Sequence, residues 1–190
     1  EYHRVALTVL ALGGDPTAFG QDADGTPIDL IADGTYSYAG ELGKQGLNGW
    51  IFALIALDAS GAAVPVDAAH SREDMVSAIV SAQNEDGGFG LLSGGKSDVD
   101  LTAMALQALA KYQEQSAVKA AVNRALVCLS TMQNADGGFS SWGTENAESC
   151  AQVILALAEL GISVDDTRFV KDGGSVLDAL LSYQNADGGF

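Results

Sequence analysis

The sequence predicts an all-α fold built from repeated helical hairpins, and two internal repeats support this prediction. The first is the heptapeptide Gln-Asn-x-Asp-Gly-Gly-Phe, which occupies residues 83–89, 133–139 and 184–190, so that successive copies begin 50 and 51 residues apart. The second is a short apolar segment rich in Ala and Leu, found at residues 6–10, 53–57, 105–109 and 153–157. A fixed period of this length is typical of folds in which one supersecondary unit stacks on the next.

Two kinds of helix alternate along the chain. The Ala/Leu segments are apolar nearly all round, which predicts inner helices buried on all sides. Glycine or proline follows three of them, at Gly13, Gly61 and Gly161, and predicts where the helix stops. The segments 71–83, 117–133 and 174–184 carry apolar residues on one stripe only, which predicts outer amphipathic helices. No segment shows the alternation of a strand, and residues 15–43 fit the repeat poorly.

The heptapeptide has a mechanical interpretation as the turn that ends each outer helix. We expect the Asp to cap the turn through its own backbone and the paired glycines to supply positive φ. The Phe would then pack between the helices, and the Gln amide would satisfy backbone groups at a nearby helix end. Calcium binding by these Asp residues is the alternative, but one such loop offers few oxygen ligands.

Composition and charge limit the classes of partner. The chain has 190 residues, a net charge of −16 and 47% hydrophobic residues, so it can bury a sizeable core. Such an acidic surface repels phosphate backbones and anionic lipid headgroups, which argues against nucleic acid and anionic membranes as partners. No apolar stretch predicts a membrane span, and no signal peptide is visible. The two cysteines, Cys128 and Cys150, are expected to be reduced core residues.

The heptapeptide resembles the Gln-Trp repeat of squalene and oxidosqualene cyclases and the related repeat of protein prenyltransferase β subunits. Phe89, Phe139 and Phe190 stand where the cyclases usually have Trp. The resemblance implies an α/α-toroid, a ring whose wall is made of inner helices and whose cavity is lined near their N-termini. That ring usually needs about six helix pairs, so we expect one α/α-toroid repeat domain over residues 1–190, incomplete or part of a larger ring.

A closer resemblance covers nearly the whole chain. Residues 48–58, 98–110, 148–161 and 168–171 are similar to blocks in secreted or surface proteins of Gram-positive bacteria, which often carry a transcobalamin-like C-terminal module. This resemblance implies a secreted or cell-surface location and no established catalytic activity. Animal cobalamin carriers use the same ring.

Aligning the inner helices brings two polar positions into register. The residues six places before the second residue of each Ala/Leu copy are Glu1, Asn48, Asp100 and Glu148, and those two places further on are His3, Trp50, Thr102 and Cys150. One interpretation is that the first set caps the inner helices, since Asp and Asn accept hydrogen bonds from free backbone N–H groups. The other is that both sets line a ligand pocket. We predict Asn48, Trp50, Asp100, Thr102, Glu148 and His3 as ligand-binding residues.

Enzymatic activity is the second hypothesis. Residues 98–102 resemble the Asp-x-Asp-Asp motif of terpenoid cyclases, with Asp100 as the acid and Leu101 in place of the last Asp. Residues 148–150 resemble the Asp-x-Cys zinc motif of prenyltransferases, with Glu148 in place of Asp, but the only histidines are His3 and His70. We predict no metal and no cofactor, because this ligand set is incomplete. The Gly-Cys-Gly-Glu-Gln motif of complement-type thioester domains is absent.

We therefore expect a non-catalytic ligand-binding or scaffold module with its site in the ring cavity. The ligand class stays open between a corrinoid, a lipid and a glycan. Contact with missing repeats or with a second copy of the chain is also expected, because the last heptapeptide is followed by no inner helix. The alternative is a terpenoid-cyclase-like or prenyltransferase-like enzyme acting on an isoprenoid substrate.

Overall fold

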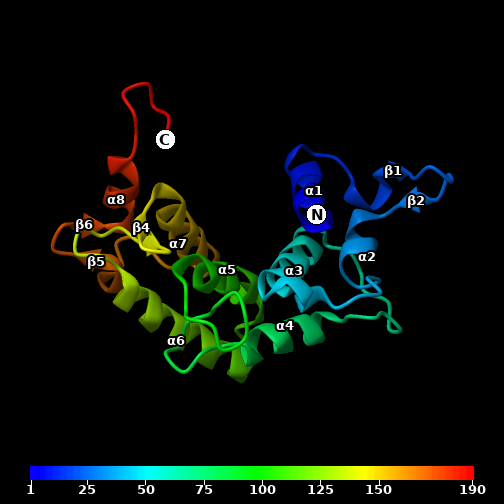
Figure 1. The fold of residues 1–190 in the computed structure, drawn as a ribbon, viewed down its shortest axis with the longest axis horizontal. Helices are drawn as coiled ribbons and strands as arrows, with labels where there is room; N and C mark the ends of the chain where they lie inside the picture. The colour runs from blue at the N-terminus through cyan, green and yellow to red at the C-terminus, as the bar shows by residue number, and fades with distance from the viewer. The chain divides into compact units, whose positions relative to one another are not determined.

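A computed structural model describes residues 1–190 and divides them into two compact units (Figure 1). Unit 1 comprises Glu1–Ser81 and unit 2 comprises Ala82–Phe190. Both units consist mainly of α-helices, as the repeat pattern predicts. No helix is long and apolar enough to cross a membrane.

Unit 1 contains one complete pair of inner and outer helices and one further inner helix. In chain order its elements are α1 (Tyr2–Ala11), η1 (Pro16–Ala18), β1 (Gly20–Gln21), β2 (Pro27–Ile28), α2 (Leu30–Gly34), η2 (Leu42–Gln45), α3 (Asn48–Ser60) and α4 (Arg72–Ser81). The inner helices α1 and α3 pack against each other, and the outer helix α4 packs on α3. The segment 15–43, which fits the repeat poorly, forms the short elements between α1 and α3.

Unit 2 contains two complete helix pairs. Its elements are α5 (Val99–Leu109), η3 (Ala110–Tyr112), α6 (Ser116–Met132), β3 (Ser140–Ser141), β4 (Thr144–Glu145), α7 (Ala147–Glu159), η4 (Thr167–Phe169), β5 (Val170–Lys171), β6 (Gly174–Ser175) and α8 (Val176–Ser182). The inner helices α5 and α7 lie side by side, while α6 packs on α5 and α8 packs on α7. The predicted alternation of inner and outer helices is therefore confirmed in both units.

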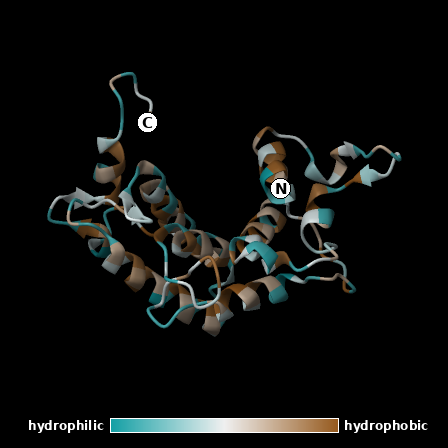
Figure 2. Ribbon diagram, viewed as in Figure 1, coloured by the Kyte–Doolittle hydropathy of each residue, from teal (hydrophilic) through white to brown (hydrophobic).

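Burial distinguishes the inner helices from one another. Eight residues of α5 and five of α3 are buried, and Figure 2 shows mainly hydrophobic residues along both helices. By contrast α1 buries only Ala6, and in α7 the side chain of Leu155 is 53% exposed, so the prediction that every Ala/Leu segment is buried on all sides is wrong for α1 and α7. For α1 the physical reason is that its main packing partners are α2, α3 and the short η1, and no outer helix is among them.

Three short hairpins correct the expectation that the chain has no strands. Strands β1 and β2, β3 and β4, and β5 and β6 form three antiparallel pairs of two residues each. Strands of this length are too short to show an alternating pattern in the sequence. They are consequences of tight turns between helices.

The heptapeptide turn has the same geometry in all three copies within the chain. The Asp side chain accepts a hydrogen bond from the second glycine N–H, at 2.9, 2.9 and 3.0 Å for Asp86, Asp136 and Asp187. Only the first glycine of each pair has a positive φ, near 86°, 90° and 88°, so the prediction that both do is wrong. In the first copy the second glycine is required for a steric reason, because a Cβ on Gly88 would come within 2.6 Å of Ser97.

The glutamine of the heptapeptide ties its own turn to the next repeat. The Gln83 Nε2 donates to the carbonyls of Gly87 and Ala121, each at 2.8 Å. The Gln133 Nε2 donates in the same way to Gly137 at 2.8 Å and to Phe169 at 2.9 Å. The amide satisfies backbone groups as predicted, but the acceptor Ala121 lies inside α6 and not at a helix end, so that part of the prediction is wrong for Gln83. The second acceptor of each amide lies 36 or more residues away.

The phenylalanine of the heptapeptide is buried in two of its three copies. Phe89 and Phe139 are fully buried between helices, as predicted, whereas Phe190 is 63% exposed. The backbone N–H of Phe89 donates to the Thr102 hydroxyl of α5 at 3.0 Å, which fixes the turn against the inner helix.

Candidate functional site

The N-termini of the inner helices of unit 2 are capped by residues that the alignment did not select. The Asp98 carboxylate accepts from the backbone N–H groups of Asp100 and Leu101, and Asn146 accepts from Ser149. The prediction that Asp100 and Glu148 are the caps is therefore wrong, since each is the second residue of its helix. A negative charge in the first turn is still favourable there, because it faces the positive end of the helix dipole.

In unit 1 the aligned residues make no capping bond either. Asn48 is the first residue of α3, Leu47 is the N-cap, and no side chain caps this helix. Glu1 is the N-cap of α1 but its carboxylate makes no capping hydrogen bond. Capping thus does not account for Asn48 or Glu1.

The corrected capping assignment makes a testable prediction for α5. We expect Asp98→Ala to lower the free energy of unfolding by about 0.5–2 kcal/mol, the usual cost of losing an N-cap. The carboxylate also accepts a hydrogen bond from the Ser141 hydroxyl at 2.8 Å, which places the loss toward the upper end. Asp100→Ala is the control: its Oδ1 is buried without a hydrogen-bond partner, which offsets the favourable interaction of its charge with the helix dipole, so its loss of stability should be smaller than that of Asp98→Ala. Urea titrations of both variants measure this, and an equal loss in both would contradict the assignment.

The second aligned position holds three buried or packed side chains. Thr102 is fully buried, and its hydroxyl donates to the Asp98 carbonyl at 2.7 Å and accepts from Phe89. Cys150 is also fully buried; burial raises the pKa of its thiol, and a backbone hydrogen bond with Phe139 partly opposes that rise. Trp50 packs edge-on against His70, with 5.5 Å between the ring centroids.

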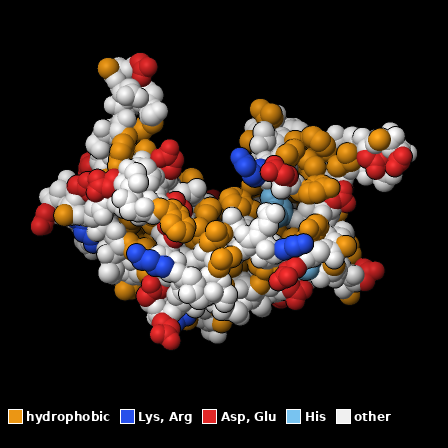
Figure 3. Space-filling model, in the orientation of Figure 1, with side chains coloured by type: hydrophobic (Ala, Val, Ile, Leu, Met, Phe, Trp, Pro, Cys, Tyr) orange, Lys and Arg blue, Asp and Glu red, His pale blue; other side chains and the backbone are white.

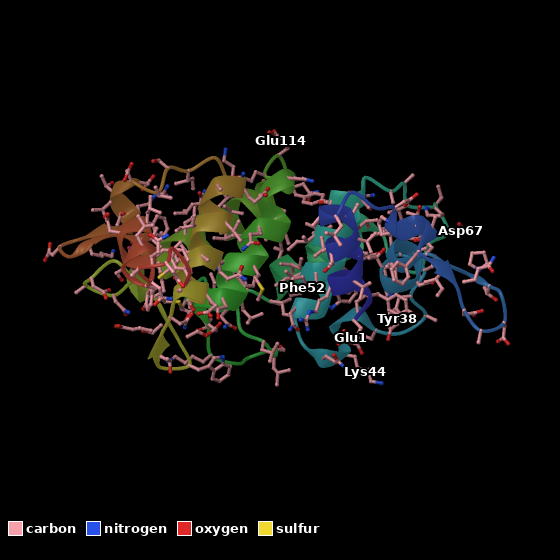
Figure 4. The ribbon with its side chains drawn as sticks, turned by 90° about the horizontal axis from the view of Figure 1, so that it is seen from above. Glu1, Tyr38, Lys44, Phe52, Asp67 and Glu114 are labelled. Carbon is pink, nitrogen blue, oxygen red and sulfur yellow. The ribbon has the colours of Figure 1, made fainter.

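A pocket of about 510 Å³ lies in unit 1, between the N-terminal turns of α1 and α3 and the segment that joins α2 to η2. Its polar lining has both signs of charge, and its apolar lining is aromatic at Tyr38 and Phe52. Figure 4 labels Glu1, Tyr38, Lys44 and Phe52 around it. The remaining lining residues include Tyr2, His3, Arg4, Glu41, Gln45 and Asn48. This pocket is of the size that holds small molecules.

His3 is held in one orientation at this pocket. Its Nε2 lies 2.5 Å from the Gly34 carbonyl oxygen, so Nε2 carries the proton and Nδ1 is left as an acceptor. Burial lowers the pKa of His3, against a smaller opposing effect of that same hydrogen bond. The ring is therefore neutral at physiological pH, and its Nδ1 can accept a hydrogen bond.

The lowered pKa of His3 predicts how stability depends on pH. Because the folded pKa lies below the unfolded value of 6.5, the native state resists protonation, and stability falls as pH drops below about 6.5. The His3→Gln variant keeps a hydrogen-bond donor for Gly34 but has no group that titrates there. Between about pH 7.5 and pH 5.5 its free energy of unfolding should therefore change less than that of the wild type. Urea midpoints at both pH values test this. The carboxylates with lowered pKa values, such as Asp166 at about 2, titrate below this window. Identical pH profiles for wild type and variant would contradict the assignment.

The structure brings together some of the predicted site residues. His3 and Asn48 line the same pocket, and Glu1 from the same alignment joins them. Trp50 is in unit 1 but does not line the pocket, and Asp100, Thr102 and Glu148 belong to unit 2. Pocket residues such as Arg4, Tyr38 and Lys44 were not predicted, because they are not among the aligned positions; only for Tyr38 did the aromatic, irregular character of residues 15–43 give a signal.

Comparison with known proteins supports the architecture. A family model described as the prenyltransferase alpha-alpha toroid domain matches residues 36–190. The chain belongs to the prenyltransferase α/α-toroid family. The all-α toroid fold predicted from the heptapeptide is thereby confirmed. No curated protein matches the chain.

The zinc site of enzymes in this toroid family is not reproduced by the residues present. Nowhere do three or more His, Cys, Asp or Glu side chains gather closely enough to hold a metal ion. Cys150 is fully buried, and its raised pKa disfavours the thiolate that zinc requires. The pair Glu148 and Cys150 therefore does not fit a prenyltransferase metal centre, and no step through zinc is derived.

Proposed function

We propose that this toroid-family chain is a non-catalytic ligand-binding module of a secreted or cell-surface bacterial protein, and that its ligand occupies the pocket between α1 and α3. The observation that carries the proposal is that Glu1 and Asn48, which hold the same aligned position in different repeats, line a single pocket together with His3. The resemblance of residues 48–58 to blocks of Gram-positive surface proteins supports the location.

The lining of the pocket favours a polar ligand of glycan type among the three classes considered. Carboxylates, cations and amides surround the pocket, with Glu41, Lys44 and Gln45 all exposed at its wall. Alternating donors and acceptors match a ring of hydroxyl groups, while Tyr38 and Phe52 offer flat faces for its C–H surface. A lipid tail would leave these charged groups unpaired, and a corrinoid with its nucleotide arm exceeds the drug-sized class that such a volume suits.

The same lining supports a binding role over catalysis. A proton donor to an alkene needs a pocket from which water is excluded and neighbouring groups that increase its acidity. Here the carboxylates of Glu1 and Glu41 are exposed, and His3 is neutral with its Nε2 proton committed to Gly34. These groups orient a ligand by hydrogen bonds.

Calorimetric titration of the full chain tests the proposal with three named probes: chitotetraose, cyanocobalamin and oleate. We expect chitotetraose to bind and Asn48→Ala to weaken that binding about tenfold, the effect of losing one buried hydrogen bond. Asp67→Asn is the control, because Asp67 is exposed in the same unit and does not line the pocket (Figure 4). Binding of cyanocobalamin or oleate in place of the sugar would overturn the ligand class, and failure of all three would overturn the pocket.

The enzymatic alternative has its own test. Turnover of a polyprenyl substrate by the wild-type chain that is lost in Asp100→Asn would replace the binding proposal with a cyclase-like activity. Retention of that turnover in Asp100→Asn would exclude Asp100 as the acid.

A further inference from the structure

We infer that the tip of the β3–β4 hairpin is a docking site for a basic, arginine-bearing segment of a protein partner, with Trp142 as its anchor. The starting observation is that Trp142 is 86% exposed and has a φ of 52°, the only positive φ at a non-glycine residue of the chain. Bulky residues resist this conformation, so a Trp here is unfavourable for folding. Such outliers persist where they serve a purpose other than stability.

The turn makes the choice of tryptophan more unusual. Trp142 and Gly143 are the two central residues between Ser141 and Thr144, and both have positive φ. Two-residue hairpins of this kind prefer Asn-Gly or Asp-Gly, because those residues adopt positive φ at little cost. The chain has the preferred glycine but places an indole where an amide would be more stable.

The hairpin presents this indole on a rigid support. Ser141 donates from its hydroxyl to Asp98 at 2.8 Å, which joins the hairpin to the N-terminus of α5. Asn134 donates from Nδ2 to the Ser140 hydroxyl and to the Glu145 carboxylate, at 3.1 and 3.0 Å. A braced hairpin loses little further entropy when a partner binds, which favours recognition by the exposed ring.

A second exposed apolar side chain occupies the equivalent place in the preceding repeat. Leu92 follows Phe89 by three residues, as Trp142 follows Phe139, and it is 64% exposed. The loop that carries Leu92 is closed by the bridge between Phe89 and Asp98, and Asp98 is the residue that binds Ser141. The two exposed side chains therefore stand on adjoining loops of unit 2.

Charge decides which partner fits. Glu145 and Glu148 are exposed beside the hairpin, and no ion pair neutralises either of them. Burial raises the pKa of Tyr183, and the charges of Glu145 and Glu148 are among the neighbouring groups that add to this rise. On the face of the molecule drawn in Figure 3, Asp and Glu side chains are more widespread than Lys and Arg side chains, in keeping with the net charge of −16. A guanidinium can stack on the indole and pair with these carboxylates, and Trp and Arg are the residues that dominate binding energy at protein interfaces.

Fluorescence anisotropy with a labelled nonaarginine peptide and the full chain tests this docking site. We expect binding that weakens with ionic strength and falls about tenfold or more in Trp142→Asn. The same variant should melt at a higher temperature than wild type, because Asn-Gly suits the turn, so lost binding cannot be attributed to lost folding. The matched control is Phe19→Ala, which removes an aromatic side chain 48% exposed near Asp22 and Asp24 in unit 1.

Three outcomes would overturn the inference. Unchanged peptide binding in Trp142→Asn would show that general acidity, not the indole, attracts the peptide. An equal loss in Phe19→Ala would show that any exposed aromatic residue suffices. Binding of neutral cellohexaose that is lost in Trp142→Asn, without peptide binding, would assign the hairpin to a glycan.

Discussion

Phe139→Ala should lower the free energy of unfolding by about 3–5 kcal/mol, the cost of deleting a fully buried phenylalanine and leaving a cavity. Phe139 is fully buried, whereas Phe190 occupies the same place in an identical heptapeptide and is 63% exposed. We therefore expect Phe190→Ala to change stability by no more than about 0.5 kcal/mol. Urea unfolding monitored by circular dichroism measures both.

This pair of variants separates packing from local turn preference. Both substitutions alter the same seven-residue sequence in the same way, so any contribution of the turn itself is common to them. A typical native protein has about 5–15 kcal/mol of stability in total, so the Phe139 variant should be close to unfolding. Equal effects of the two substitutions would show that burial of the phenylalanine is not what the repeat requires.

Gly137→Ala is expected to have the second largest effect, a loss of about 2–5 kcal/mol. Its φ is 90°, which costs about 1–2 kcal/mol for a residue with a Cβ. A Cβ would also come within 2.5 Å of the Gly174 carbonyl oxygen. Such overpacking forces neighbouring atoms to shift and typically lowers stability by about 1–3 kcal/mol more.

Gly188 provides the control for the steric part of this effect. Its φ is 88°, but a Cβ there would meet no atom within 4 Å. Gly188→Ala should therefore show the conformational cost of about 1–2 kcal/mol alone. Thermal unfolding of both variants gives the comparison. A Gly188→Ala loss as large as that of Gly137→Ala would mean that backbone conformation, and not contact with Gly174, limits this position.

The repeat made the helical architecture predictable. Three copies of one heptapeptide at spacings of 50 and 51 residues placed the outer helices that end before Gln83, Gln133 and Gln184 within a few residues of their observed bounds. The roles of Gln83 and Phe89 also followed from the pattern, because a turn repeated with the same residues must solve the same packing problem each time.

The site was predictable only in part, because side chains outside the repeat help to build it. Glu1 and Asn48, which hold equivalent positions of adjacent inner helices, line one pocket with His3, whereas Trp50, the equivalent of His3, does not. The binding role of His3 and Asn48 stays a prediction. Lys44 was missed because it lies in the short η2, which is not part of the repeat, so no period fixes its position. The capping residues Asp98 and Asn146 were missed because α5 and α7 each begin about two residues earlier than the alignment implied.

Trp142 was missed for a different reason. In the sequence it is one aromatic residue in a polar stretch, and nothing there distinguishes an exposed ring from a buried one. Only backbone conformation and exposure together mark it as unusual.

The amide of Gln133 has a consequence for how the chain unfolds. Because this one side chain is bonded both to Gly137 and to Phe169, loosening of the backbone around Phe169 leaves a polar donor at the end of α6 without its acceptor. The free-energy cost of the unpaired donor thus arises one repeat away from the segment that opened. Gln83 links the turn at Gly87 to Ala121 in the same manner. Neighbouring hairpins of unit 2 are thus thermodynamically coupled, and amide exchange of α6 and of the segment around Phe169 should follow a shared opening reaction.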